Sequence, residues 1–290
     1  MNSGFYTALG TPFDENGNFI AESFTKHIED QICAGASGLL IMGSMGIEPY
    51  VKESEYIKVA RTGAEAARGR CPIFIGVMDN SVSRIKDKID SLSGLKIDGI
   101  VTTAPFYYAV NQNEIIRFFT LIAAYSGFPV YIYDLPEVTN IKVDVNIIDM
   151  LSKNNNIKGI KTGDIFTARV LTRKLARNDF SVFFSGLDVF DIAYKYGIMM
   201  NLDGMFVCTA PLATMMYANL KNGEYGKAAF YLDQILELRD IFVSVGVFSG
   251  FSYAMNLLGY EGRFSPDYCI ELKEDQAERV MNCMKKINLI

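Results

Sequence analysis

Histidine and cysteine are scarce in this sequence, which contains one histidine, His27, and five cysteines among 290 residues. Zinc sites use cysteine and histidine ligands at short spacings, and no two of these cysteines have the CxxC spacing. The cysteines are also odd in number and scattered, which disfavours a framework of disulfides. We therefore expect no metal site and a reduced, cytoplasmic protein.

An excess of positive charge and long apolar runs are also lacking. The chain has 28 lysines and arginines against 33 aspartates and glutamates, so electrostatics gives no support to binding of nucleic acid or of anionic membranes. No apolar run approaches the roughly 18 residues of a membrane-spanning helix. The first residues lack a basic segment followed by an apolar one, so we expect no signal peptide.

Half of the residues are apolar, which is enough for a large core, and they follow an alternating pattern. Short runs rich in β-branched and aromatic residues alternate with longer segments of helical period, at intervals of roughly 25 to 35 residues, the length of one βα unit. Eight such units predict a (β/α)8 barrel, an α/β fold of the TIM-barrel type. The predicted strands are Phe5–Leu9, Gly38–Gly43, Pro72–Val77, Gly99–Ala104, Pro129–Tyr133, Ile157–Lys161, Phe180–Ser185 and Gly204–Thr209.

The residues after the eighth predicted strand have helical periodicity. The expected helices lie near Pro211–Lys221, Tyr225–Val243, Phe251–Leu258 and Lys273–Ile287. The first of these would complete the barrel, and no linker rich in proline, glycine or serine precedes the others. The sequence therefore predicts a barrel over residues 1–222 and a helical extension over residues 223–290 that packs on it.

A lysine ends the sixth predicted strand, and the active site of such a barrel lies at the C-terminal ends of its strands. In NIKGIKTGD, Lys161 shares one face with Gly159 and Ile157 and should point into the barrel, whereas Lys158 falls on the opposite face. Gly159 would leave room beneath Lys161. Burial disfavours the charged ammonium, and a neutral amine can attack a carbonyl to form a Schiff base. The competing interpretation is a strand-end lysine that extends to solvent.

Tyr133, which ends the fifth strand in VYIYDLP, is the candidate acid and base. Schiff-base chemistry needs a group that moves protons between the hydroxyl, the imine and the leaving oxygen. No histidine lies at a predicted strand end, so a tyrosine is the plausible group for this role. Taken alone, however, an interior tyrosine with a hydrogen-bonded hydroxyl is the more common case.

Two turns at strand ends are candidates for binding substrate. In GSMG, after the second strand, glycines on both sides of Ser44 and Met45 let the backbone turn sharply and present N–H groups, which suits a carboxylate. Glycine-rich turns are common in βα units, so the alternative is a tight connection. Asp188, in SGLD after the seventh strand, could bind substrate hydroxyls or cap the following helix.

These motifs, taken in order, resemble the dihydrodipicolinate synthase and N-acetylneuraminate lyase family of class I aldolases. ALGTPFDENG lies near the start, GSMGIE is similar to the family's GTTGE, and APFYY is similar to its PYY. YDLP is similar to YNxP, GIK to the strand of the Schiff-base lysine, and SGLD to SGxD. The likeness covers nearly the whole chain and is looser around NLLGYEGRFSP. The ordered set is specific, although each motif alone is not.

The resemblance implies catalytic roles for the matching residues. Lys161 would form the imine with pyruvate or another 2-oxo acid, and Tyr133 would act as acid and base. Ser44 and Tyr107 would relay protons to Tyr133, with Tyr107 able to reach in from a neighbouring subunit. The N–H groups of Ser44 and Met45 would hold the carboxylate.

The resemblance also implies further contacts and an assembly. Gly186 and Asp188 of SGLD would contact substrate, and the main chain near Phe206 would line the Schiff-base pocket. The partners would be a small 2-oxo acid, pyruvate, and an aldehyde, and no metal or organic cofactor is needed. The likeness further suggests a homotetramer built as a dimer of dimers.

Several positions depart from the family pattern and bear on the substrate. Met45 replaces a threonine of GTTG, so carboxylate binding would rest more on the backbone. Val138 stands where the synthases carry an arginine, which argues against a dicarboxylic semialdehyde. Val189 and Gly163 stand where neuraminate lyases carry a glutamate and a threonine that contact the sugar. Asp134 replaces the asparagine of YNxP.

The sequence thus predicts a pyruvate-dependent class I aldolase or lyase that forms a Schiff base on Lys161. Its expected reaction cleaves or makes a 2-keto-3-deoxy sugar acid or a related 2-oxo acid. The alternatives are a 4-hydroxy-tetrahydrodipicolinate synthase with an altered aldehyde site, an N-acetylneuraminate lyase, or a non-catalytic family member that binds 2-oxo acids.

Overall fold

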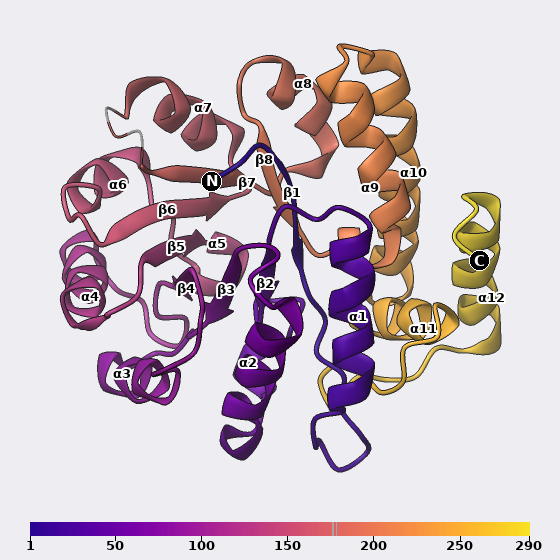
Figure 1. Cartoon of the computed structure of the whole chain (residues 1–290), viewed down its shortest axis with the longest axis horizontal. Coiled ribbons are helices and arrows are strands. Elements are labelled where there is room, and N and C mark those ends of the chain that lie inside the picture. The colour runs from indigo at the N-terminus through magenta and orange to yellow at the C-terminus, as the bar shows by residue number, and fades with distance from the viewer. Residues whose placement is uncertain (176, 178) are drawn as a thin grey trace.

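Eight parallel strands close into a barrel in the part of the chain that the structure describes (Figure 1). This computed structural model describes residues 1–175, 177 and 179–290. Each strand pairs with its neighbours in chain order, and β1 closes the barrel against β8. The strands are β1 Gly4–Ala8, β2 Leu39–Ile41, β3 Ile73–Gly76, β4 Gly99–Thr103, β5 Val130–Asp134, β6 Ile157–Thr162, β7 Ser181–Phe184 and β8 Met200–Asp203. The predicted (β/α)8 fold is therefore confirmed.

Helices follow the strands along the chain and surround the barrel (Figure 1). They are α1 Ala21–Cys33, α2 Glu53–Ala67, α3 Val82–Ser91, α4 Gln112–Tyr125, α5 Pro136–Thr139, α6 Val145–Leu151, α7 Ile165–Lys174, α8 Phe190–Lys195, α9 Phe206–Lys221, α10 Tyr225–Val245, α11 Val247–Leu257 and α12 Glu274–Lys286, with 3-10 helices η1 Glu48–Tyr50 and η2 Leu187–Val189. Local sequence sets several starts. Asn111 and Glu114 form a capping box at α4. Asp144 and Asp164 cap α6 and α7 by accepting hydrogen bonds from backbone N–H groups.

Aromatic side chains fill the inside of the barrel. Tyr6, Phe74, Tyr131 and Phe183 come from four different strands and belong to one buried cluster. Their rings pack with centroid distances of 4.8 Å to 6.5 Å, several of them edge to face. This filled interior forms a floor, so a ligand site can open only above it, at the strand ends.

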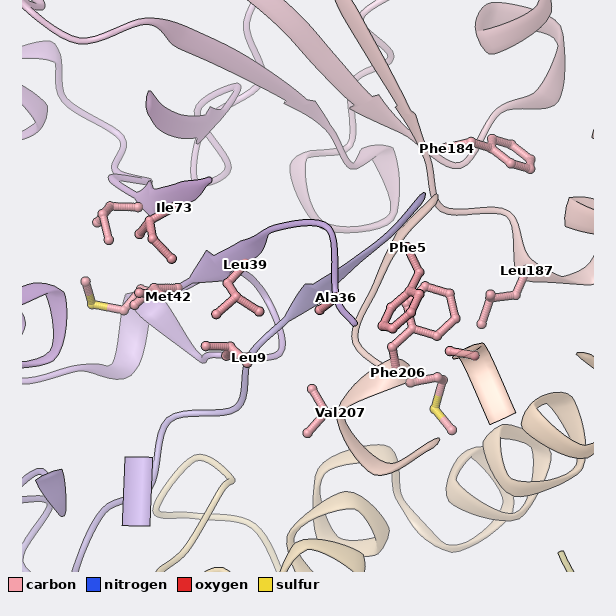
Figure 2. Close-up of a cluster of buried hydrophobic side chains, with 14 of the residues drawn as sticks. Phe5, Leu9, Ala36, Leu39, Met42, Ile73, Phe184, Leu187, Phe206 and Val207 are labelled. Atoms are coloured by element: carbon pink, nitrogen blue, oxygen red, sulfur yellow. The ribbon is translucent and has the colours of Figure 1, made fainter. Parts of the chain in front are cut away.

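A second and larger core lies between the strands and the helices. Figure 2 shows part of it, where Phe5 on β1 meets Phe206 at the start of α9 with ring centroids 5.5 Å apart. Strands of a parallel barrel are buried on both faces, which explains why their sequences are apolar nearly throughout.

The eighth strand lies earlier in the chain than the sequence predicts. We expect it at Gly204–Thr209, but β8 is Met200–Asp203, and α9 already begins at Phe206. The run MFVCT is short and apolar, as a buried strand would be, yet it is buried because the start of α9 packs against β1. Periodicity does not separate these two cases in so short a run. The other seven predicted strands agree with the structure to within two residues at each end.

The chain after α9 forms helices that pack on one side of the barrel. Helix α10 lies along α9 and contacts α8, and α11 and α12 pack against α10 (Figure 1). The predicted helices are confirmed, although α11 begins at Val247 and not at Phe251. Since α9 ends at Lys221 and α10 begins at Tyr225, we propose the division into residues 1–222 and 223–290. Within the described ranges, no helix combines the length and apolar character needed to cross a membrane.

His27, the single histidine, is fully buried on α1. Its ring packs against those of Tyr260, Phe24 and Phe264, with centroids 5.1, 6.4 and 6.5 Å away. Burial in these apolar surroundings lowers its pKa to about 3, although the carboxylate of Asp30 acts in the opposite direction. The fold therefore accommodates His27 as the neutral imidazole.

Replacing His27 with phenylalanine should make folding less sensitive to acid. Between pH 6.5 and about 3 the unfolded chain binds a proton at His27 that the folded protein does not, so this group lowers the free energy of unfolding by about 1.4 kcal/mol per pH unit on acidification. In urea unfolding, the difference in free energy between wild type and His27→Phe should grow as the pH falls from 6.5 to 5 and should approach this slope near pH 5. Parallel pH profiles of the two proteins would contradict the assignment.

Candidate active site

Lys161 and Tyr133 lie side by side at the C-terminal end of the barrel. They are paired directly in the parallel register of β6 and β5. The Lys161 Nζ atom lies 3.9 Å from the centroid of the Tyr133 ring. Lys161 is 8% exposed and Tyr133 is 5% exposed, so both are buried in the barrel mouth. The prediction that Lys161 points inward is confirmed, and the alternative of a solvated lysine is wrong.

Tyr131 fills the space that Gly159 leaves on the Lys161 face of β6. A side chain on Gly159 would come within 2.7 Å of the Tyr131 ring, so the glycine is needed for close packing and not for an open space. Lys158 lies on the opposite face, as predicted, and pairs with Asp179. Lys161 therefore stands above an aromatic floor, while Lys158 of the same strand is a cation on the outward face.

Ser44 connects Tyr133 to the turn that follows β2. Its hydroxyl donates a hydrogen bond to the Tyr133 hydroxyl oxygen at 3.3 Å. The turn lies between Met42 and Ile47, whose φ angles of 54° and 48° are in the left-handed region that residues other than glycine rarely adopt. Strain of this kind persists only where the surrounding structure imposes it. The fold thus holds the GSMG turn in one shape that places Ser44 on Tyr133.

Glu48 anchors the far end of this turn in the protein interior. Its side chain is wholly buried and accepts a hydrogen bond from Lys88 Nζ at 2.6 Å. The same ammonium donates to the Met78 carbonyl oxygen at 2.7 Å and lies 3.3 Å from the carboxylate of Asp79. Burial raises the pKa of the Glu48 carboxyl to about 7, and Lys88 opposes that rise. The strained turn therefore depends on a buried ion pair.

Tyr107 is not in contact with Tyr133 in the described part of a single chain. It lies in the loop after β4, is 74% exposed, and packs on Tyr108 with ring centroids 4.8 Å apart. The N–H groups of Phe106 and Tyr107 both donate to the Asn80 side-chain oxygen, each at 2.8 Å, which fixes this loop against the loop after β3. The relay role of Tyr107 from a neighbouring subunit stays a prediction.

Met45 covers the β8 side of the mouth. A side chain on Gly204 would come within 2.8 Å of Met45 Cγ, so the turn between β8 and α9 needs a glycine there. Met45 is half-buried and packs against both cores. The Phe206 side chain is wholly buried against Phe5, so any contact of Phe206 with a ligand would come from its main chain.

Asp188 forms an ion pair at the end of β7. Its two carboxylate oxygens accept hydrogen bonds from Arg239 of α10 at 2.6 and 2.8 Å, and this guanidinium holds the pKa of the Asp188 carboxyl below its usual range. Val189 and not Asp188 is the N-cap of α8, so the capping alternative is wrong. A side chain on Gly186 would come within 2.3 Å of the Phe184 ring. Substrate contacts of Gly186 and Asp188 stay predictions.

Asp203 is a residue near Lys161 that the sequence prediction missed. It ends β8, and its side chain accepts a hydrogen bond from the Met205 N–H at 2.8 Å. Burial raises the pKa of its carboxyl, and the positive charge of Lys161 opposes the rise. The predicted eighth strand begins four residues too late and therefore leaves out Asp203. The polar end of NLDG was the signal that could have revealed it.

The arrangement puts an amine and a phenol in one buried mouth, with the GSMG turn joined to the phenol through Ser44. In the residues described, no group of three or more histidine, cysteine, aspartate or glutamate side chains is placed to hold a metal ion. An amine beside a phenol can form an imine with a carbonyl compound and exchange protons with it. The N–H groups of the GSMG turn suit a carboxylate on the same ligand.

Comparison with known proteins gives matches over nearly the whole chain. The model of the dihydrodipicolinate synthetase family matches residues 1–287. The curated 4-hydroxy-tetrahydrodipicolinate synthase of Bartonella bacilliformis is 31% identical over 265 residues, which cover 90% of this chain and 89% of that protein. The synthase of Rhodopseudomonas palustris is 29% identical over 258 residues, with 88% and 86% covered.

Solved structures of the same family share the fold. A prophage protein of the dihydrodipicolinic acid synthase family from E. coli K12, solved in complex with pyruvate, superposes with a TM-score of 0.90 at 21% identity, covering 100% of both chains. Dihydrodipicolinate synthase from Thermotoga maritima gives a TM-score of 0.91 at 22% identity, again over 100% of both chains. At these identities the likeness supports the barrel and its C-terminal helices.

Removing the partner of Glu48 should destabilise the protein in a pH-dependent way. Lys88→Met leaves a buried carboxylate unpaired, which should cost about 3–5 kcal/mol of unfolding free energy at pH 8. The pKa of the Glu48 carboxyl is about 7 with Lys88 present and should be higher without it, so the loss should shrink as this carboxyl is protonated below pH 7. Urea unfolding at pH 8 and pH 6 measures the effect.

Arg84→Met is the matched control for Lys88→Met. Arg84 is 60% exposed and also pairs with Asp79, so its loss should cost less than about 1 kcal/mol at either pH. An equal loss for Lys88→Met at both pH values would show that burial of the Glu48 charge is not the cause.

Proposed function

This chain belongs to the dihydrodipicolinate synthetase family, and from that premise we propose that it is a pyruvate-dependent class I aldolase. Lys161 forms a Schiff base with pyruvate or a related 2-oxo acid, and the enzyme makes or cleaves the bond between the pyruvate methyl carbon and an aldehyde carbon. The observation that carries the proposal is the buried pair of Lys161 and Tyr133, with the lysine Nζ atom 3.9 Å from the ring centroid.

Tyr133 performs the proton transfers in this proposal. The neutral amine of Lys161 attacks the ketone carbon, and the ketone oxygen leaves as water after taking protons through Tyr133, which gives the protonated imine. Loss of a methyl proton forms the enamine, whose carbon attacks the aldehyde, and hydrolysis of the imine then releases product and restores the amine. Ser44, hydrogen-bonded to the Tyr133 hydroxyl, passes protons onward, and Tyr107 of a neighbouring subunit joins this relay.

Backbone groups of the strained turn bind the substrate carboxylate. Met45 offers no hydroxyl, so the N–H groups of Ser44 and Met45 carry this contact. Gly186, Asp188 and the main chain near Phe206 line the rest of the pocket. The reaction needs neither a metal nor an organic cofactor, because the imine itself withdraws electrons from the bond that reacts.

The preferred substrate is a 2-keto-3-deoxy sugar acid or a related 2-oxo acid. Val138 is 52% exposed and stands where an arginine would bind a second carboxylate. Val189 and Gly163 provide no polar side chain for a sialic acid. The Asp188 carboxylate already accepts two hydrogen bonds from Arg239. These features favour a substrate whose aldehyde part carries neither a second carboxylate nor the long side chain of a sialic acid.

The second candidate is a 4-hydroxy-tetrahydrodipicolinate synthase with an altered aldehyde site. It is favoured by the names of the curated relatives, which are 29% and 31% identical to this chain. Val138 argues against it. An N-acetylneuraminate lyase has less support, because both of its sugar contacts are replaced. The interpretation as a non-catalytic protein that binds 2-oxo acids is supported mainly by Met45, which replaces a threonine of the family pattern.

We also propose that the protein is a homotetramer, a dimer of dimers, in the cytoplasm. Tyr107 and Tyr108 are 74% and 76% exposed, as expected for side chains that a second copy covers. On α7 and α8, Phe166 and Ile192 are 68% and 57% exposed, and Ile192 borders a largely apolar cavity of 390 Å³. This apolar surface suits the second subunit interface of such a tetramer. A cytoplasmic location fits the five cysteines, all of which are free thiols.

Treatment with pyruvate and borohydride should add a reduced pyruvyl group to Lys161. Borohydride converts the imine into a stable secondary amine, and peptide mass mapping locates the added mass. Lys158 in the same strand is the internal control, because it points outward and pairs with Asp179. The proposal fails if the mass is unchanged, or if the label is found on another lysine and persists in Lys161→Ala.

A panel of 2-keto-3-deoxy sugar acids should release pyruvate when the protein is added. Condensation of pyruvate with aspartate semialdehyde should have a kcat/KM at least about tenfold lower, because no arginine at position 138 pairs with the carboxylate of the semialdehyde. Val138→Arg should raise the semialdehyde activity and leave pyruvate release from the sugar acids largely unchanged. A wild-type protein that prefers the semialdehyde would establish the second candidate instead.

A further inference from the structure

Asp134 is a carboxylate buried next to the proposed catalytic pair, and it has three partners. Its side chain is 1% exposed. It accepts hydrogen bonds from the Thr162 hydroxyl at 2.8 Å and from the Val143 N–H at 3.0 Å, and it forms an ion pair with Lys142. A buried carboxylate needs such partners, because an unpaired one is strongly destabilising. The position that is asparagine in YNxP therefore carries a charge that the fold neutralises locally.

The strand register places this carboxylate directly behind the reacting groups. Asp134 follows Tyr133 on β5, and Thr162 follows Lys161 on β6. The register pairs Tyr133 with Lys161 and Asp134 with Thr162. Successive side chains of a strand point to opposite faces, so Asp134 and Thr162 point outward. They form a hydrogen bond with each other one residue beyond the inward-pointing pair. The hydrogen bond between Asp134 and Thr162 thus joins the two strand ends that present the amine and the phenol.

Lys142 extends this connection to the next helix. Its Nζ atom lies 3.4 Å from the Thr162 hydroxyl and 3.5 Å from the carboxylate of Asp164. Asp164 is the N-cap of α7 and accepts hydrogen bonds from the N–H groups of Phe166 and Thr167. One ammonium therefore links the end of β5 to the residue that begins the helix after β6. Because two carboxylates already neutralise it, Lys142 acts as a support and not as a site for an anionic ligand.

We propose that Asp134 and Lys142 are positioning residues for imine formation at Lys161. The pair acts through Thr162 and the ends of β5 and β6, and it holds the Lys161 amine in its place over Tyr133. This inference rests on the proposed Schiff-base function and adds to it two residues that lie outside the barrel mouth. The two charges neutralise each other, so removal of one charge should slow imine formation more than removal of both.

The test times imine formation in the full chain. Samples with saturating pyruvate are quenched with borohydride at intervals, and mass spectrometry measures the fraction of protein that carries the reduced adduct on Lys161. Lys142→Gln should slow the reaction about ten- to hundredfold, because small displacements of a reacting group have effects of this size. Asp134→Asn should slow it about tenfold, and the double variant should be at least about fivefold faster than Lys142→Gln.

Two further measurements separate positioning from general damage. The half-saturating pyruvate concentration should change by less than about threefold in these variants, because the turn at residues 43–46 holds the carboxylate. Lys158→Gln is the matched control, because it removes an ion pair with Asp179 from the outward face of the same strand, away from the strand end. Its rate should equal that of wild type.

The outcomes distinguish this inference from the proposed function. Wild-type rates in Lys142→Gln and Asp134→Asn, or a double variant no faster than Lys142→Gln, would overturn the positioning role and leave the function intact. If Lys142→Gln does not fold, Asp134→Asn decides the matter, since a tenfold loss supports the role and a wild-type rate overturns it. An absence of imine in the wild-type protein refutes the proposed function and this role together.

Discussion

The parallel pairing of β5 with β6 is the constraint on which the candidate site depends. It sets Tyr133 beside Lys161 inside the barrel and Asp134 beside Thr162 outside it. Because successive side chains alternate between the faces of a strand, a slip of one residue in β6 would turn Lys161 away from Tyr133. Aromatic packing on Gly159 fixes the pairing from below, and the bonds of Asp134 fix it from behind.

Charge is buried around the strand ends, while the floor beneath them is aromatic. Glu48 is neutralised by Lys88 at one side of the mouth, and Asp134 is neutralised by Lys142 at the other. Each pair fixes a segment of the candidate site: the strained GSMG turn in the first case and the ends of β5 and β6 in the second. Buried ion pairs add little net stability, so their value here is to fix positions. The Nζ atom of Lys161 lies 3.9 Å from the centroid of the Tyr133 ring, and the Asp203 carboxyl is close enough to interact with its charge.

The barrel and the inward placement of Lys161 and Tyr133 were predictable because they depend on local periodicity. Alternation along NIKGIKTGD and VYIYDLP is enough to point Lys161 and Tyr133 inward at strand ends. The basic side chains that pair with carboxylates at the strand ends were not predictable, because their positions depend on the path of distant loops and helices. Lys142 reaches Asp134 from the linker after α5, and Arg239 reaches the end of β7 from α10. Strand β8 was missed because a short apolar helix start and a buried strand share one pattern.

In the proposed reaction, Lys161 activates the methyl group of pyruvate through an imine. Exchange of the pyruvate methyl protons with deuterated water, followed by proton NMR, measures this activation without any knowledge of the aldehyde. The account predicts that the methyl signal decays in the presence of the protein and persists in the presence of Lys161→Ala. Pyruvate that binds the wild-type protein yet keeps its methyl protons would contradict the account and would mark a binding protein in place of an enzyme.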